Sequence, residues 1–357
     1  MQKAEKCVGM KGACVFVGRD DGWLQIDEDS TTSPKPYPPI SDSWSKSDTS
    51  LFLSIASFRD KLCPRTLYNA FTKATHPERI TIGVVQQNED VDPDCLEQYC
   101  VLARSDELFI SKFNHLKGSR DENFCPFEKN VRMHRVQAGK AKGPTWARAL
   151  GSKLLEQEEF CMQTDAHMDF VPNWDTLMMQ MWSLTENEYA VLSTYVAAIE
   201  TLKDQLPGEK GTNKLFEVPH LCMVTLNGMG NMVRNWGTKA IRMANKPKMT
   251  NMIWGAGLSF SKCHAERKVP YDPHTPFIFD GEEFSRALRF WTYGYDIYSP
   301  HRVYVVHDYT KSQSDPTHSA WFANSGDLQE GSQMDSLIRL RTLHGMPYGE
   351  EDSGNIT

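Results

Sequence analysis

An aspartate and a histidine stand two positions apart in Phe160–Trp174, a segment that reads FCMQTDAHMDFVPNW. Its apolar start predicts a buried strand that ends where the polar residues begin. Open α/β sheets bind ligands at the carboxyl ends of their strands, so we expect Asp165 and His167 at such an edge. Residues two apart in an extended chain point to the same side, and Asp169 falls on that side too. A carboxylate and an imidazole placed in this way can share a divalent metal, although a turn-capping aspartate and a packed histidine give the same spacing.

Strands and helices alternate around this motif. Strands are predicted for 51–57, 80–88, 131–138 and 159–163, and helices for 58–74 and 143–155. The first two strands are continuous apolar runs, which are typical of parallel strands buried on both faces. The order predicts an α/β fold with an open, Rossmann-like, mostly parallel sheet flanked by helices.

The chain divides into three predicted regions. Residues 1–48, rich in Ser, Pro, Asp and Gly, predict an extended lead-in with a short strand at 13–18. Residues 49–310 predict the main domain, and residues 311–357 a C-terminal extension with an amphipathic helix near 334–345. The apolar face of that helix would either pack on the domain or form a homodimer contact.

Three further features of the main domain are predicted beyond the motif. A helix is expected at 174–185, and strands at 189–196, 220–227 and 302–309. A strand followed by a helix is expected within 277–300, and long loops between 201 and 251.

The composition is that of a folded protein with a slight acidic excess. The 357 residues are 40% hydrophobic and 24% charged, which excludes collagen-like and disordered classes. The net charge of −7 argues against nucleic-acid binding by charge neutralisation. The N-terminal residues lack a signal-peptide pattern, and no apolar run is long enough to cross a bilayer, so we expect a soluble chain, with an N-terminal anchor upstream of it as the open alternative.

Nine cysteines are scattered along the chain without a CxxC pair. Their odd number and irregular spacing argue against a disulfide framework or a zinc site. We therefore expect reduced thiols and a cytoplasmic location.

Several segments between Leu51 and Tyr309 together resemble a known family. They are SIASFRD, GVVQQN, GPTWARALGSKLL, QTDAHMDFVPNWD, WGAGLSFS, FDGEEFSRALRFWTYGYDIYSP and VYVVHDY. In this order they resemble the GT-A glycosyltransferases that use nucleotide sugars. More narrowly, they resemble the polypeptide N-acetylglucosaminyltransferases typified by the cytoplasmic enzyme that modifies a hydroxyproline on the SCF ubiquitin-ligase adaptor. The Asp-x-His element and the Trp-Gly loop are also similar to those of the mucin-type polypeptide transferases.

The resemblance implies a metal site and a donor. Asp165 and His167 would hold Mn²⁺ or Mg²⁺, and His307 in VVHDY would supply the third protein ligand. Such a metal would neutralise the charge of the departing UDP without proton transfer. Asp308, beside His307, is a possible substitute ligand, and a satisfied strand-end histidine is the structural alternative for His307.

Further residues are expected at the UDP-GlcNAc donor, from the resemblance and from their place at strand and helix ends. Those expected to contact the donor are Ser54, Ser57, Arg59, Arg148, Asp165, Trp254 and Gly255. Three of them have a structural alternative. Arg59 could be a surface arginine in a loop, Arg148 an arginine on a helix surface, and Trp254 a tryptophan of the core. The acidic residues Asp280, Glu282 and Glu283 precede a helix, where acids also serve capping, and at least one is expected to bond a sugar or acceptor hydroxyl.

The resemblance implies a retaining transfer of GlcNAc to a protein hydroxyl, with hydroxyproline of an SCF-adaptor-like protein as the first acceptor. Transfer to Thr or Ser of secretory glycoproteins, or non-catalytic binding of a UDP-sugar, are the alternatives. Two mechanisms stay open. In one the leaving phosphate oxygen takes the acceptor's proton on the front face of the sugar; in the other Glu282 or Asp280 forms a covalent intermediate.

Overall fold

The structure is a computed structural model that describes residues 14–18, 22–25, 37–113, 123–202, 217–226, 232–250, 253–310 and 327–346. Most of the predicted lead-in and of the predicted C-terminal extension therefore lies outside the described residues. Within the described part, no helix combines the length and the apolar character needed to cross a membrane.

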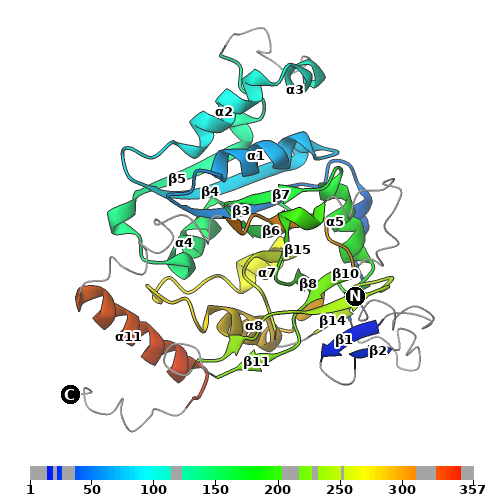
Figure 1. Ribbon diagram of the computed structural model, residues 1–357, viewed down its shortest axis with the longest axis vertical. Helices are drawn as coiled ribbons and strands as arrows, with labels where there is room; N and C mark the ends of the chain where they lie inside the picture. Colours follow the sequence, from blue (N-terminus) through cyan, green and yellow to red (C-terminus); the bar gives the residue numbers. More distant parts are fainter. Residues whose placement is uncertain are drawn as a thin grey trace.

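An eight-stranded sheet forms the centre of the molecule (Figure 1). Its strands, in spatial order, are β14 (Lys248–Met249), β16 (Asp296–Ser299), β8 (Ala190–Ser193), β15 (Leu258–Lys262), β6 (Phe160–Asp165), β3 (Leu51–Phe58), β4 (Ile80–Asn88) and β5 (Val131–Gln137). Only β14 and β15 run opposite to the other six strands. The predicted α/β fold with an open, mostly parallel sheet flanked by helices is confirmed.

Buried apolar side chains explain why β3 and β4 lie inside this sheet, with a neighbouring strand on each side. Leu51, Leu53 and Ile55 of β3 are fully buried, as are Ile82 and Val84 of β4. Each such side chain contributes about 1.5–3 kcal/mol relative to exposure to water. The carboxyl ends of β3, β4, β5 and β6 consequently lie at one edge of the sheet, where ligands bind in open α/β folds.

Helices cover the sheet and complete the core. Their bounds are α1 (Cys63–Thr72), α2 (Cys95–Ser105), α3 (Glu107–Lys112), α4 (Pro144–Gly151), α5 (Trp174–Ser183), α7 (Cys263–Lys268), α8 (Glu282–Thr292) and α11 (Asp327–Leu343). In Figure 1, α2 and α3 lie near one end of the molecule and α11 near the other. The main core joins the sheet to α1, α2 and α5, with Trp174 and Trp182 fully buried.

Three smaller sheets surround the central one. The first contains β7 (Met168–Phe170), β17 (Val305–His307) and β9 (Ala197–Ala198). The second joins β10 (Glu217–His220), β13 (Lys239–Arg242), β1 (Cys14–Gly18) and β2 (Gly22–Gln25), and the third joins β11 (Val224–Thr225) to β12 (Arg234–Asn235). The short strand predicted in the lead-in is thus confirmed as β1, which pairs with β13.

The C-terminal helix packs within its own chain. Leu337 and Leu340 of α11 are 4% and 3% exposed and contact Met232 and Ile278. This part of the face is therefore covered, whereas Leu343 at the end of α11 is 59% exposed, and a homodimer contact stays a prediction.

One predicted strand is absent. The segment 277–280 forms a turn before α8, with Phe277 in the left-handed region at φ 60°. The positive φ interrupts the extended backbone that the apolar sequence FIF predicts, so the expected strand–helix unit is a turn, a helix and then β16.

The expectation of reduced cysteines is wrong for six of the nine. Disulfides join Cys63 to Cys95, Cys100 to Cys125, and Cys161 to Cys263. Their partners lie 25 to 102 residues apart, so the folding of the sheet and of α1, α2 and α7, and no local spacing, brings them together. Cys222 is exposed and unpaired among the described residues.

Peptide mapping without reductant is expected to recover these three cross-links. Replacing Cys161 and Cys263 together by alanine should lower the free energy of unfolding by about 2–4 kcal/mol, because a cross-link over a long loop restricts the unfolded chain. Urea unfolding measures this, with Cys222→Ala as the matched control that changes stability by about 0.5 kcal/mol or less. Recovery of all six cysteines as free thiols would contradict the assignment.

Candidate functional site

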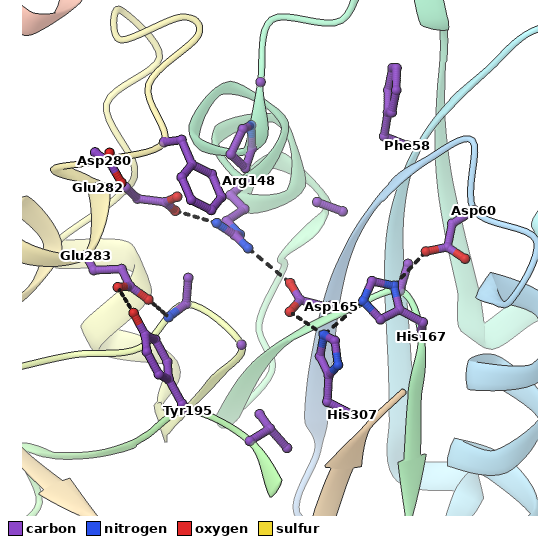
Figure 2. Close-up of a pocket in the computed structure, with 18 of the residues that line it drawn as sticks. Phe58, Asp60, Arg148, Asp165, His167, Tyr195, Asp280, Glu282, Glu283 and His307 are labelled. Atoms are coloured by element: carbon purple, nitrogen blue, oxygen red, sulfur yellow. Dashed lines mark hydrogen bonds and ion pairs between the residues drawn. The ribbon is translucent and has the colours of Figure 1, made fainter. Parts of the chain in front are cut away.

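A cavity of about 480 Å³ opens at the carboxyl edge of the sheet (Figure 2). Its wall includes the end of β3, the end of β6, the end of β17, and the starts of α4 and α8. Side chains from sequence segments more than 100 residues apart meet here, as the position of the Asp165 motif at a strand end predicts.

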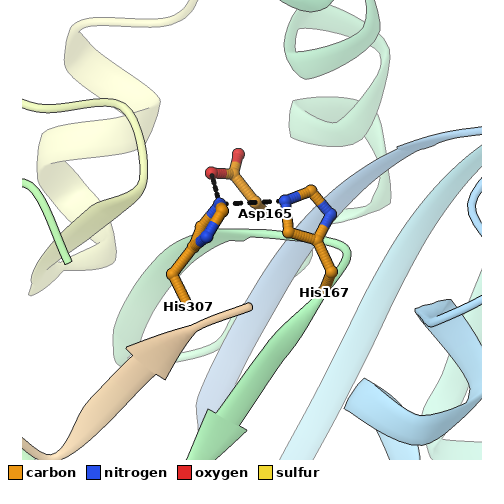
Figure 3. A group of neighbouring side chains, drawn as sticks. All are labelled: Asp165, His167 and His307. Carbon is orange, nitrogen blue, oxygen red and sulfur yellow. Dashed lines mark hydrogen bonds and ion pairs between the residues drawn. The ribbon is translucent and has the colours of Figure 1, made fainter. Parts of the chain in front are cut away.

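The three predicted metal ligands converge in this cavity (Figure 3). One ligand atom from each of Asp165, His167 and His307 lies within 4.8 Å of the others. The two Nε2 atoms of the histidines are 2.9 Å apart, and His307 Nε2 is 3.5 Å from Asp165 Oδ2. The prediction that these residues come together is confirmed.

Strand pairing explains this convergence. β17 runs antiparallel to β7, with His307 directly opposite Met168. This register sets His307 beside His167, and the backbone N–H of Asp308 donates to the carbonyl of His167 at 2.9 Å. Asp165 is the last residue of β6, paired at its end with Ala56 of β3.

The donor set fits a divalent cation such as Mn²⁺. Two imidazoles and one carboxylate suit first-row divalent ions and leave positions open for phosphate oxygens. Burial alone would raise the pKa of Asp165, but the hydrogen bond with His307 and the charge of Arg148 hold that pKa well below its usual range. The carboxylate is therefore ionised and ready to act as a ligand at neutral pH.

Arg148 connects the triad to the acidic residues of α8. Its guanidinium donates to Glu282 at 2.6 Å and to Asp165 at 3.2 Å, and both Arg148 and Glu282 are buried. Burial disfavours the charged form of Arg148, but the carboxylates of Glu282 and Asp165 hold its pKa above the usual value of an arginine. The cationic arginine therefore lies between the metal-ligand set and the opposite wall of the cavity.

Glu283 anchors the opposite wall. Its carboxylate accepts hydrogen bonds from the Tyr195 hydroxyl at 2.7 Å, the Asn235 amide at 2.9 Å and the Ala256 backbone N–H at 3.0 Å. Burial raises the pKa of Glu283 to about 7 in spite of these donors. Gly257, in the same loop as Ala256, lies so close that an added Cβ would be 3.4 Å from Asp165 Oδ2. Glu283 thus fixes the loop that faces the ligand set.

Asp280 also lines the cavity, at its outer side. Its carboxylate forms an ion pair with Arg234 at 3.5 Å, and the Arg234 side chain is 49% exposed. All three predicted acidic residues are thus brought to the cavity.

Five residues that were expected to contact the donor do not line the cavity. Ser54 packs against Gly151 of α4, Ser57 is 1% exposed, and Arg59 pairs with Asp92 at 2.7 Å. The indole of Trp254 is buried in the core, where its N–H donates to Ser259. Gly255 lies against the Thr194 backbone, where an added Cβ would come within 2.9 Å, so this glycine is required for packing.

Several lining residues were not predicted. They are Phe58, Asp60, Tyr195 and Tyr309. Phe58 ends β3 and Asp60 follows it, within the segment SIASFRD, where residue type does not show which side chains point into the cavity. Tyr195 and Tyr309 lie two residues after the ends of β8 and β17, and this closeness to strand ends is the sequence signal that could have found them.

A family model described as Glycosyltransferase (GlcNAc) matches residues 50–348. This match spans most of the chain and includes every residue of the cavity described above. The chain therefore belongs to the GlcNAc glycosyltransferase family.

Solved glycosyltransferases share low sequence identity with the chain. GalNAc-T7 with UDP, GalNAc and Mn²⁺ is 14% identical over 86% of this chain and 56% of that chain, with a TM-score of 0.47. The Pyrobaculum calidifontis mannosyltransferase PcManGT with GDP-Man and Mn²⁺ is 12% identical over 87% and 74%, with a TM-score of 0.43. S. aureus TarS 1–349 with UDP-GlcNAc is 13% identical over 82% and 73%, with a TM-score of 0.41. A search of curated proteins gives no significant match.

Removing the buried arginine is expected to destabilise the fold. Arg148→Met leaves Glu282 buried without its cationic partner, which should cost about 3–5 kcal/mol in urea unfolding. The double variant Arg148→Met/Glu282→Leu removes both charges and should recover most of that loss. A double variant as unstable as the single one would contradict the pairing.

Stability should also depend on the ionisation of Glu283. The folded-state pKa of about 7 lies above that of an unfolded glutamate, so the folded protein holds the proton more tightly. This contribution is present below pH 4 and is lost as the pH rises to 7, by about 3 kcal/mol in total. Unfolding between pH 5 and pH 8 should show this decline in the wild type and lack it in Glu283→Gln. Parallel pH profiles for the two proteins would refute the assignment.

Proposed function

We propose that the chain transfers N-acetylglucosamine from UDP-GlcNAc to a protein hydroxyl in a metal-dependent reaction. The observation that carries the proposal is the meeting of Asp165, His167 and His307 in a cavity of a GlcNAc glycosyltransferase family member. A divalent cation held by these residues would offset the charge that develops on the diphosphate as the glycosidic bond breaks. The identity of the sugar rests on the family.

Three other side chains of the cavity have separate roles in the proposed reaction. Arg148 supplies a buried positive charge next to Asp165, which favours a diphosphate group nearby. Asp280, at the outer side of the cavity, is placed to accept a hydrogen bond from a hydroxyl of the sugar or the acceptor. Glu283 holds the loop over the site.

We propose retention of configuration through a front-face reaction. The acceptor oxygen bonds to the anomeric carbon as the bond to the β-phosphate oxygen breaks, and that phosphate oxygen takes the acceptor's proton. Glu282 pairs with Arg148, and Asp280 with Arg234, so both candidate nucleophiles of a double displacement are engaged in ion pairs. The pairs favour the front-face route over a covalent intermediate.

Two acceptors and two locations are proposed, and one observation separates them. The resemblance favours hydroxyproline on an SCF-adaptor-like protein in the cytoplasm. The disulfides Cys63–Cys95, Cys100–Cys125 and Cys161–Cys263 favour Ser or Thr of glycoproteins in an oxidising compartment, because glutathione keeps cytosolic thiols reduced. We give weight to the second proposal for this reason.

Transfer assays on the purified full chain test the proposal. With UDP-GlcNAc and Mn²⁺, we expect sugar transfer to a peptide hydroxyl, its loss in EDTA and its recovery with added Mn²⁺. Peptides with hydroxyproline, with threonine and without a hydroxyl separate the acceptors. Turnover of UDP-galactose or UDP-glucose in place of UDP-GlcNAc would contradict the sugar assignment, and tight UDP binding without turnover would favour a binding protein.

A matched pair of aspartate variants tests the ligand set. Asp165→Ala should lower the rate of transfer roughly 100- to 1000-fold, because the developing charge loses its stabilisation. Asp169→Ala is the control, since this nearby carboxylate pairs with Lys73 outside the ligand set, and it should retain transfer. Equal activity of the two variants would refute the role of Asp165.

A further inference from the structure

We infer that Asp60 is a positioning residue that fixes the ring of His167 for metal binding. The inference rests on the metal site proposed above and adds a residue that does not itself belong to the ligand set. Asp60 Oδ2 lies 2.7 Å from His167 Nδ1, and the Asp60 side chain is 4% exposed (Figure 2). His167 Nε2, on the other side of the ring, points to His307 and the ligand cluster.

The contact with Asp60 determines which ring nitrogen of His167 carries the proton. A carboxylate only accepts, so His167 Nδ1 carries the proton that it donates to Asp60. When the ring is neutral, Nε2 then carries the lone pair that a metal needs. A carboxylate behind a metal-bound histidine also raises the basicity of the ligand nitrogen, and loss of such a partner typically costs 10- to 100-fold in metal affinity.

Asp60 is itself fixed by the turn that enters α1. Its other oxygen, Oδ1, accepts the backbone N–H of Leu62 at 2.8 Å, and its carbonyl accepts the N–H of Cys63 at 3.3 Å. Both oxygens thus have assigned partners, and the carboxylate cannot rotate away from His167 without breaking the bond from Leu62.

The backbone of His167 is held independently of Asp60. The hydroxyl of Thr66, in α1, donates to the carbonyl of Ala166 at 2.8 Å and accepts from the N–H of Met168 at 2.9 Å. These bonds fix the residues before and after His167, and Asp308 N–H fixes its carbonyl. Removal of the Asp60 carboxylate should therefore release the ring and leave the strand in place.

His307 differs from His167 in this respect. Its Nδ1 is buried and has no hydrogen-bond partner among the described residues. His167 is thus the histidine whose tautomer is set by the protein before a metal binds.

Mn²⁺ binding to the full chain, measured by the electron paramagnetic resonance signal of free Mn²⁺, tests the inference without any transfer reaction. Asp60→Ala should weaken Mn²⁺ binding by about 10- to 100-fold. Asp60→Asn should weaken it less, because an amide oxygen can still accept from Nδ1 but carries no charge. Asp92→Ala is the matched control at the same edge, since Asp92 binds Arg59 and does not line the cavity, and its Mn²⁺ affinity should equal that of the wild type.

A spectroscopic measurement separates positioning from a general structural effect. Long-range ¹H–¹⁵N spectra of the metal-free wild type should show the Nδ1–H tautomer at His167, and Asp60→Ala should shift it toward the Nε2–H form. The thermal midpoint of Asp60→Asn serves as the check on folding and should stay close to that of the wild type.

Three results would overturn parts of the account separately. Unchanged Mn²⁺ affinity in both Asp60 variants, or an Nε2–H tautomer in the wild type, refutes the role of Asp60 alone. No Mn²⁺ binding to the wild type refutes the proposed metal site. Normal Asp60-dependent Mn²⁺ binding without GlcNAc transfer refutes the proposed reaction and supports the positioning role.

Discussion

The antiparallel pairing of β17 with β7 is the constraint on which the site depends. It joins residues about 140 positions apart and sets His307 opposite Met168, next to His167. The central sheet supplies the third ligand, because β6 ends at Asp165. Neither sheet alone contains the ligand set, so the candidate metal site exists only where the small sheet meets the edge of the large one.

Ion pairs hold the charged side chains on the two walls of the cavity. Arg148 lies between Asp165 and Glu282, and Arg234 faces Asp280. An isolated buried charge would cost several kcal/mol, whereas paired charges with hydrogen bonds are tolerated. A diphosphate entering this cavity would meet both the ligand triad and a fixed guanidinium.

Glu283 fixes a second part of the cavity wall, the loop at Ala256. Its carboxyl receives three hydrogen bonds, from a tyrosine, an asparagine and a backbone N–H, and so connects α8 to three other segments. The wall that faces Asp165 is thus held by one half-buried side chain. Rigid walls of this kind favour a fixed orientation of donor and acceptor.

The sequence predicted the features that depend on local pattern. Continuous apolar runs located β3 and β4, and the abrupt change to polar residues after Gln163 located the ligand edge. The Asp-x-His spacing, read together with the family resemblance, brought His307 into the ligand set. The turn at 277–280 escaped prediction because its backbone, with Phe277 at positive φ, is not encoded by apolar pattern.

Features that depend on distant packing could not be predicted. The disulfide between Cys161 and Cys263 follows from the pairing of β6 with β15, across 102 residues. Trp254 was expected at the sugar and instead fills the core, since residue type does not distinguish a stacking platform from a buried ring. Asp60 was overlooked because its partner, His167, lies 107 residues away in the bend between β6 and β7.

The most direct test of the central claim is a crystal structure with UDP and Mn²⁺, with anomalous scattering recorded to locate the manganese. We expect one strong anomalous peak within bonding distance of Asp165, His167 and His307, with diphosphate oxygens completing the coordination of the manganese. A peak at other side chains, or UDP bound with no manganese near the three residues, would contradict it.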